Sequence, residues 1–188
     1  ITIVDGADAG RALSAPRYFL AAGARPTIPG IEGLDSVRYH TSDTVMRLEQ
    51  LPRRLGVIGG GFIAAEMGHV FSGLGSEVHL FNRSDRMLRA FDDEIAERFT
   101  HAFAQRVHAH LGSLPSRVEQ RGDAIVLHTS DGEVEVDELL VAVGRQPNSD
   151  LLGVTAAGIA THADGRVAVD DTQATSVPGV YAVGDLSN

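Results

Sequence analysis

A glycine-rich segment in the middle of the chain has the residue types and the spacing that bind a pyrophosphate. The segment Gly59-Gly60-Gly61-Phe62-Ile63-Ala64 matches the pattern G-x-G-x-x-G/A. Gly59 permits a tight turn, Gly61 lets the backbone approach the phosphates, and Ala64 keeps the following helix near the sheet. Unpaired N–H groups at the start of that helix would face the phosphates. A glycine-rich turn that only packs well is the alternative.

Residues 82–89, which follow the apolar run 78–81, bear on the choice between NAD and NADP. In NAD-binding folds an acidic residue about 20 positions on accepts hydrogen bonds from the ribose. Asn82 stands at that place, followed by Arg83, Arg86 and Arg89. Guanidinium groups bind a phosphate through two hydrogen bonds, so this pattern favours NADP. The alternative is a solvated charged loop, in which the arginines pair with Asp85, Asp92 and Asp93.

The elements that must position these residues follow from the hydrophobic pattern. Residues 55–58 form a compact apolar strand, and residues 62–74 have a helical pattern that ends at Gly75. Residues 78–81 form a second strand, which makes a right-handed strand–helix–strand crossover. Because the glycine pattern lies between this strand and helix, the context favours a dinucleotide site. The central region is therefore predicted to be a Rossmann-like α/β domain.

Further elements are predicted on both sides of this crossover. A helix is expected over 92–107, β-hairpin strands over 117–120, 124–129 and 133–136, and a buried parallel strand over 139–143. Before the crossover, residues 1–30 have β patterns, and a short helix capped by Thr41 is expected to end at Gln50. The prolines and glycines of 26–33 indicate a domain crossing.

Composition excludes several function classes. The chain has 188 residues with a net charge of −9, which argues against nucleic acid as a partner. It has neither lysine nor cysteine, so Schiff-base lysines, disulfides and cysteine zinc sites are excluded. No apolar run approaches the roughly 20 residues of a membrane span. His101, His108 and His110 match no zinc pattern, so we expect solvated histidines and no metal.

Four segments together resemble the pyridine nucleotide–disulfide oxidoreductase family. They are residues 22–26 (AGARP), 59–66 (GGGFIAAE), 143–148 (VGRQPN) and 180–185 (VYAVGD), and their order and spacing cover nearly the whole chain. Within the family, residues 39–46 and 62–66 look most like the mycothione reductases. Dihydrolipoamide dehydrogenases and glutathione reductases are similar as well.

The resemblance implies a domain plan. Residues 1–36 would be part of an FAD-binding domain, 37–148 an NAD(P)-binding domain inserted into it, and 149–188 the return to the FAD-binding domain. The FAD glycine fingerprint, the redox cysteine pair and the His-Glu acid–base pair of the family are missing here. We therefore expect a piece of a longer, homodimeric, cytoplasmic protein, with no catalytic residue in this segment.

The resemblance also assigns roles to individual residues. Phe62 would be the aromatic gate over the flavin, with a core aromatic as the alternative. Glu66 would lie near the nicotinamide, with a first-turn carboxylate that complements the helix dipole as the alternative. The implied NADPH site comprises Gly59, Gly61, Phe62, Ile63, Ala64, Glu66, Asn82, Arg83, Arg89 and Gly144, and the implied FAD site comprises Gly23, Gly184 and Asp185.

The expected function is the NADPH-binding part of an FAD-dependent disulfide reductase. In that family, hydride passes from NADPH to FAD, and electrons then pass to a cysteine pair and to a small disulfide such as mycothione. Two alternatives stay open: an NAD-dependent, dihydrolipoamide dehydrogenase-like fragment, and a non-catalytic dinucleotide-binding module. The segment by itself is expected to have no disulfide reductase turnover.

Overall fold

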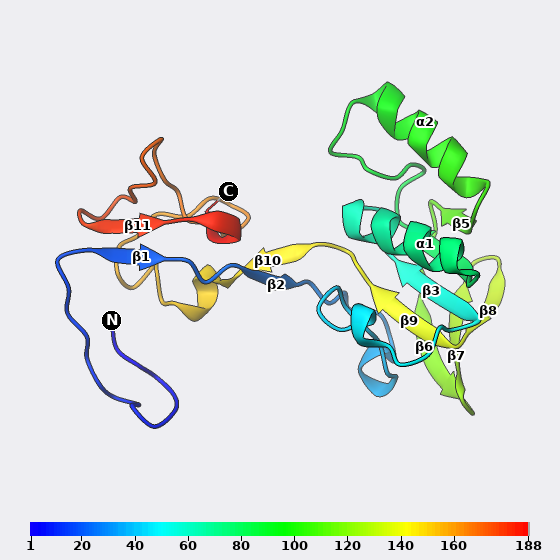
Figure 1. Ribbon diagram of the computed structural model, residues 1–188, viewed down its shortest axis with the longest axis horizontal. Coiled ribbons are helices and arrows are strands. Elements are labelled where there is room, and N and C mark those ends of the chain that lie inside the picture. The colour runs from blue at the N-terminus through cyan, green and yellow to red at the C-terminus, as the bar shows by residue number, and fades with distance from the viewer. Residues whose placement is uncertain (188) are drawn as a thin grey trace. The chain divides into compact units, whose positions relative to one another are not determined.

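A computed structural model of the chain describes residues 1–187 and divides into two compact units (Figure 1). One unit consists of residues 1–25 together with the chain from residue 145 onward, and the other of residues 26–144. We call them the outer unit and the central unit. The sequence predicts boundaries between an FAD-binding and an NAD(P)-binding domain after residues 36 and 148. Those boundaries are defined by cofactor binding and stay predictions. Among residues 1–187, no helix has the length and apolarity needed to span a bilayer.

The central unit is built on a four-stranded parallel sheet. Its strands are β3 (Arg54–Ile58), β4 (Glu77–Asn82), β5 (His108–Leu111) and β9 (Glu138–Val141), in the order β5-β4-β3-β9. All neighbouring pairs are parallel. The chain therefore leaves β3 toward β4 and β5 and returns on the other side of β3 with β9. This reversal of strand order is the switch point at which open α/β sheets bind ligands.

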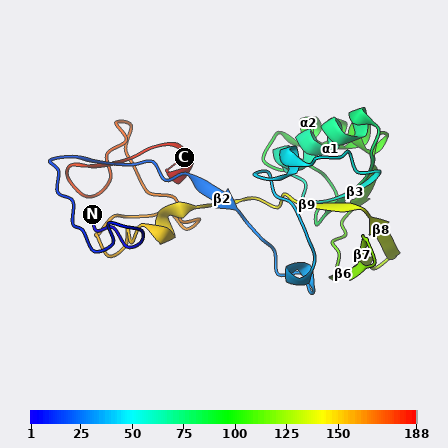
Figure 2. The ribbon, with the colours of Figure 1, turned by 60° about the horizontal axis from the view of Figure 1, so that its bottom comes forward.

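Helices cover one face of this sheet and a three-stranded antiparallel sheet covers the other (Figure 2). The helices are α1 (Phe62–Leu74) and α2 (Asp93–Ala104), and the antiparallel strands are β6 (Arg117–Arg121), β7 (Ala124–Thr129) and β8 (Gly132–Val136). Successive residues of each central strand enter opposite cores. Leu80 packs in the core beneath the helices, whereas Phe81 packs in the core with the antiparallel sheet. Burial on both faces explains why these strands are almost continuously apolar.

Local signals set the end of α1 and the start of α2. The helix α1 ends at Gly75, which has φ 105° and whose N–H bonds the carbonyls of the last turn. Asp92 caps α2 by accepting hydrogen bonds from the N–H groups of Glu94 and Ile95 at 3.0 and 3.4 Å. The prediction for α1 is confirmed in its bounds, and α2 is confirmed with an earlier end.

Two predicted helical stretches are wrong in part. The expected helix ending at Gln50 is only a 3₁₀ turn, Val45–Arg47, because the backbone leaves the helical region at Leu48, which has φ −59° and ψ 128°. The helix expected to reach residue 107 stops at Ala104, because the chain turns there into β5, a strand that was not predicted. A further 3₁₀ turn of the central unit spans Leu34–Ser36.

The outer unit holds two pairs of short strands. The strand β1 (Tyr18–Leu20) pairs in parallel with β11 (Val180–Ala182), and β2 (Ala24–Pro26) pairs with β10 (Arg145–Pro147). Two 3₁₀ turns, Asn148–Leu151 and Gly184–Leu186, follow β10 and β11. Leu186, Ala182 and Val167 are fully buried in a small core. The Arg25 guanidinium donates to both oxygens of Asp150, at 2.9 and 2.6 Å.

Candidate functional site

A surface hollow of about 240 Å³ lies where the carboxyl ends of β3 and β4 meet the start of α1. It is lined by Gly60, Gly61, Phe62, Asn82, Arg83, Ser84, Arg86, Leu88, Arg89, Ala90 and Val143. Its position beside β3, between β4 and β9, is the switch point of the sheet. A dinucleotide in this fold class binds at that place.

Gly59 brings three strand ends together at the base of the hollow. Its N–H donates to the carbonyl of Phe81 at 2.9 Å, and the N–H of Ala142 donates to the carbonyl of Ile58 at 2.8 Å. A Cβ on Gly59 would lie 2.2 Å from the Ala142 carbonyl oxygen, and its φ is 138°. Only glycine fits both constraints, so the tight-turn role predicted for Gly59 is a property of this backbone.

Gly60 stands at a variable position of the pattern G-x-G-x-x-G/A, yet the structure leaves no room for a side chain there. A Cβ at this position would lie 2.4 Å from Cγ of Asn82, whose side chain occupies the space above the turn. The Asn82 amide donates to the carbonyls of Ser84 and Arg86 at 3.2 and 2.8 Å, and the residue is buried. Asn82 thus fixes the loop after β4 with its amide group.

Gly61, in contrast, faces open space. A Cβ built on Gly61 would meet no atom within 4 Å. The residue lines the hollow and immediately precedes α1, whose first N–H groups lack helical partners. The positive end of the helix dipole therefore faces a space with room for an anionic group.

The loop after β4 is tied directly to the glycine turn. The N–H of Leu88 donates to the carbonyl of Gly60 at 2.7 Å, and Leu88 has φ 55°, a backbone region that leucine rarely adopts. Leu88, Ala90 and Val143 line the hollow without having been predicted. Apolar residues such as these do not predict a binding site from the sequence. They line the hollow only because the folded chain brings them there.

The arginines of this loop differ in their bonding. Arg86 forms an ion pair with Asp93 at 2.5 Å, as the charged-loop alternative supposed. Arg89 donates to the hydroxyl of Ser84 at 3.1 Å. Within residues 1–187, no carboxylate lies within ion-pair distance of Arg83 or Arg89, and both are exposed at the hollow. In the part of the chain that the structure describes, these two guanidinium groups therefore have no carboxylate partner.

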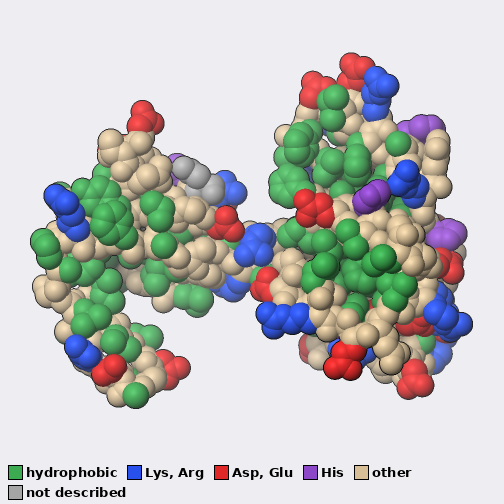
Figure 3. All heavy atoms as spheres, in the orientation of Figure 1, with side chains coloured by type: hydrophobic (Ala, Val, Ile, Leu, Met, Phe, Trp, Pro, Cys, Tyr) green, Lys and Arg blue, Asp and Glu red, His purple; other side chains and the backbone are tan. Residues whose placement is uncertain are grey.

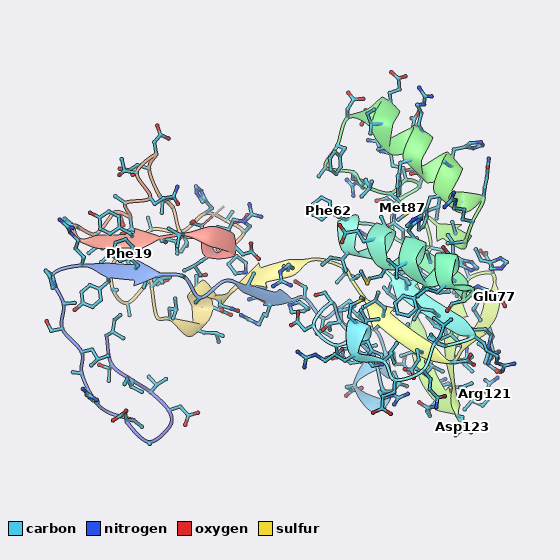
Figure 4. The ribbon with its side chains drawn as sticks, in the orientation of Figure 1. Phe19, Phe62, Glu77, Met87, Arg121 and Asp123 are labelled. Carbon is cyan, nitrogen blue, oxygen red and sulfur yellow. The ribbon has the colours of Figure 1, made fainter. Side chains whose placement is uncertain are left out.

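Phe62 stands at the mouth of the hollow, at the first position of α1 (Figure 4). It is 58% exposed and packs edge-on against Phe91, with ring centroids 6.0 Å apart. The alternative of a core aromatic is therefore excluded. Glu66 is exposed and lies in the second turn of α1, so the alternative of a first-turn carboxylate is wrong.

The predicted NADPH-site residues thus divide into two groups. Those that line the hollow are Gly61, Phe62, Asn82, Arg83 and Arg89. Those that do not line it are Gly59, Ile63, Ala64, Glu66 and Gly144. Gly59 and the buried Ala64 shape the turn and the helix beneath it, and Ile63 packs against the core under the helices. Gly144, with φ 142°, follows Val143 at the rim.

The three predicted FAD-site residues lie in the outer unit, after the carboxyl ends of two paired strands. Gly23 follows β1, and Gly184 and Asp185 follow β11, with Leu20 in register with Ala182. Gly23 and Gly184 both have positive φ, 65° and 70°. The Asp185 carboxylate is 64% exposed and lies 3.6 Å from Nε of Arg145. Parallel strand ends are the usual position of a ligand in such sheets.

Charged side chains of both signs intermix on the face shown in Figure 3, and that face has no continuous basic patch. This distribution agrees with the net charge of −9. A protein that binds nucleic acid through its phosphates needs a basic face. The arginines at the hollow are a local exception in an acidic chain.

The comparison with known families gives a match over almost the whole chain. The sequence model described as pyridine nucleotide-disulphide oxidoreductase matches residues 2–188. A mycothione reductase of Mycobacterium tuberculosis is 45% identical over 182 residues, which cover 96% of this chain and 39% of the relative.

Solved structures of flavoprotein disulfide reductases and related oxidases have a similar fold. A HOCl-induced flavoprotein disulfide reductase of Escherichia coli has a TM-score of 0.83 at 29% identity, covering 91% of this chain and 40% of its own. An engineered water-forming NADPH oxidase, made from the Lactobacillus brevis NADH oxidase and bound to NADPH, has a TM-score of 0.83 at 26% identity, covering 96% and 41%. The chain thus spans about two fifths of the length of each protein.

Proposed function

The chain belongs to the pyridine nucleotide-disulphide oxidoreductase family, and we propose that it is the NADPH-binding part of an FAD-dependent disulfide reductase. NADPH, when bound, would supply a hydride for FAD, and the electrons would then reach a cysteine pair. This chain contains no cysteine, so its own contribution is to bind and orient the nucleotides.

The observation that carries the choice of NADPH is a shared spacing of residues. The engineered NADPH oxidase differs from its NADH oxidase parent by five substitutions, which introduce alanine, alanine, arginine, serine and arginine at successive intervals of 18, 1, 1 and 5 residues. The same intervals, counted from Ala64, reach Asn82, Arg83, Ser84 and Arg89. Four of these five residues have the engineered types, and Asn82 takes the place of the aspartate that the engineering removes.

The charges at the hollow give this spacing a physical reason. The 2′-phosphate that distinguishes NADPH from NADH is an anion, and Arg83 and Arg89 are free of carboxylate partners within residues 1–187. Ser84 orients the Arg89 guanidinium through its hydroxyl. An acidic side chain at the end of β4 would repel the phosphate, whereas Asn82 is neutral and buried.

The shape of the hollow also fits a dinucleotide. The space beyond Gly61 is empty to at least 4 Å from a Cβ position, and the start of α1 offers unpaired N–H groups to a pyrophosphate. Phe62 would cover the nicotinamide side, and Gly144 and Glu66 would lie near it. These three roles follow the family pattern.

We further propose that the outer unit holds part of an FAD site. Gly23 and Gly184 would let the backbone approach the flavin nucleotide, and the exposed Asp185 carboxylate would accept hydrogen bonds from its ribityl hydroxyls. The parent protein would be a cytoplasmic homodimer that reduces a small disulfide such as mycothione. The 45% identity to a mycothione reductase supports this substrate over other disulfides.

The test is a calorimetric titration of the protein with NADPH and, separately, with NADH. We expect tighter binding of NADPH, and a loss of roughly ten- to hundredfold in NADPH affinity for Arg83→Ala and for Arg89→Ala, because each removes a charged hydrogen bond. NADH affinity should stay unchanged. Arg98→Ala, an exposed arginine of α2, is the matched control.

Equal affinities for the two nucleotides, unaffected by either variant, would contradict the NADPH assignment and favour an NADH-dependent protein. Turnover is tested with the full-length protein, which should reduce mycothione with NADPH. The 188-residue chain should bind NADPH and reduce no disulfide, because it lacks cysteine. NADPH binding by a full-length protein without any disulfide reduction would instead favour a non-catalytic module.

A further inference from the structure

Three histidines and a glutamate gather on neighbouring strands of the central unit. The strands β4 and β5 pair in parallel, with His79 in register with His108 and Phe81 in register with His110. Because side chains alternate along a strand, Glu77, His79 and Phe81 lie on one face of β4. The rings of His79 and His108 stack with centroids 4.6 Å apart, and Phe81 stacks on His110 at 4.5 Å.

This cluster lies away from the nucleotide hollow. Glu77 begins β4, whereas Asn82, which lines the hollow, ends the same strand. Figure 4 shows Glu77 and Phe62 at opposite sides of the central unit. Nothing in the proposed NADPH site uses Glu77 or the three histidines. Their arrangement therefore needs an account of its own.

The donor atoms of the cluster have the spacing of metal ligands. One oxygen of Glu77, Oε1, lies 3.1 Å from Nε2 of His79 and 3.4 Å from Nε2 of His108. Ligand atoms from these three residues all lie within 4.8 Å of one another. Zinc bonds of about 2.0–2.1 Å to nitrogen and oxygen place tetrahedral ligand atoms about 3.3 Å apart. The two short distances match that separation, and the stacked rings of His79 and His108 must turn so that the nitrogen lone pair of each points at the ion.

We propose that Glu77, His79 and His108 bind a divalent transition-metal ion of the zinc type, with His110 as a positioning residue. Two imidazoles and one carboxylate are a donor set that zinc accepts, with water in the fourth position. The exposed fractions of the side chains, 50% for Glu77 and 61% for His108, leave the site open to that water. His79, at 15%, anchors the site inward.

His110 lies beside the second ring nitrogen of His79. Nδ1 of His79 lies 3.4 Å from Nε2 of His110, so one of these nitrogens donates to the other. Without a metal, Nε2–H of His79 donates to Glu77 and Nδ1 accepts from His110. With a metal on Nε2, the proton moves to Nδ1 and is donated to His110. Metal-binding histidines regularly donate their second N–H to a neighbour in this way.

The neighbouring charge does not oppose a cation strongly. Arg54 of β3 stands in register with Glu77, but its guanidinium is already paired with Glu135 at 2.9 Å and with Asp137 at 2.7 Å. The Arg54 guanidinium is therefore neutralised by two carboxylates other than Glu77. A bound ion would join β5, the edge strand of the sheet, to β4.

Sequence order hides this site, since Glu77 and His79 are separated from His108 by α2 and no zinc pattern spans that interval. No metal was expected, because His101, His108 and His110 match no zinc pattern. We now propose a metal site instead, because the register of β4 and β5 places His79 beside His108 although the two residues are far apart in the sequence.

The experiment uses the untagged protein after removal of metal with a chelator. Zinc is titrated calorimetrically, and Co²⁺ is added separately as a spectroscopic probe. We expect one Zn²⁺ per chain, a higher unfolding midpoint with zinc, and the intense visible bands of tetrahedral Co²⁺. His79→Ala, His108→Asn and Glu77→Gln should each lose at least tenfold in affinity. His110→Asn should lose less and keep the stoichiometry.

Controls separate this site from weak binding by surface histidines. His101→Ala and His69→Ala alter exposed histidines outside the cluster and should leave zinc affinity unchanged. Should His79→Ala fail to fold, the exposed His108→Asn carries the test, since surface substitutions rarely change stability much. Absence of saturable zinc binding, or equal affinity in the folded His108→Asn and parent proteins, would overturn the proposal.

Discussion

The carboxamide of Asn82 occupies the space directly above Gly60, so that a Cβ on Gly60 would lie 2.4 Å from Cγ of Asn82. The same carboxamide donates to two carbonyls of the following loop. The end of β4 and the glycine turn are therefore one packed unit. This packing places Arg83 and Arg89 beside the turn that would hold the pyrophosphate.

Replacement of Gly60 by alanine is expected to destabilise the protein by about 1–3 kcal/mol, the usual cost of overpacking. The added methyl group meets a side chain that is buried and held by two hydrogen bonds, so it cannot move aside at little cost. Urea unfolding followed by circular dichroism measures the change. An unchanged midpoint would show that Asn82 does not occupy this space in solution.

Replacement of Gly61 by alanine should give the opposite pattern. Its Cβ meets nothing within 4 Å, so the free energy of unfolding should change by less than about 1 kcal/mol. The methyl group would stand in the hollow, and NADPH affinity should fall about tenfold or more. Unfolding and calorimetric titration of the same samples check both parts. Unchanged NADPH affinity would place the pyrophosphate elsewhere.

Replacement of Asn82 by aspartate should weaken the fold. A carboxylate cannot donate to the carbonyls of Ser84 and Arg86, and it would face them in a buried place. The expected loss is about 2–4 kcal/mol at neutral pH. Asp85→Asn, in the exposed part of the same loop, should change stability by less than about 0.5 kcal/mol. Equal stability of both variants in urea unfolding would contradict the amide bonds described above.

The Arg54–Asp137 pair is expected to make stability depend on pH. Burial alone would raise the pKa of Asp137, but hydrogen bonds from the side chain and the N–H of Arg54 outweigh burial and lower this pKa from 3.8. A lowered pKa in the folded state stabilises the fold above pH 3.8, and this contribution is lost as the pH falls further. Asp137→Asn should therefore cost about 1–3 kcal/mol at pH 7 and much less near pH 3.

Urea unfolding at several pH values tests this dependence. Asp123→Asn is the control, because Asp123 lies in an exposed hairpin turn (Figure 4). A difference between parent and Asp137→Asn that stays constant from pH 7 to pH 3 would show that the charge of Asp137 contributes nothing.

The sequence determined the glycine turn, α1 and the antiparallel strands, because their signals are local. Gly59 and Gly75 impose backbone conformations that other residues adopt at a cost, and the apolar residues of β3 and β4 suit strands buried on both faces. The arginines after β4 likewise predict a phosphate-binding site from their type and position alone, and that role stays a prediction. The identity of a residue and of its neighbours in the sequence is enough to predict features of this local kind.

Tertiary structure alone decided the strand β5 and its contacts. The segment His108–Leu111 is short and has no strong strand pattern, and it becomes a strand because it pairs with β4 at the sheet edge. That pairing brings His108 to Glu77 and His79 across an interval that contains α2. In the same way, only the folded loop brings Asn82 over Gly60 and Leu88 to the hollow. Contacts between distant residues depend on strand register and loop closure, and neither can be read from the order of residues alone.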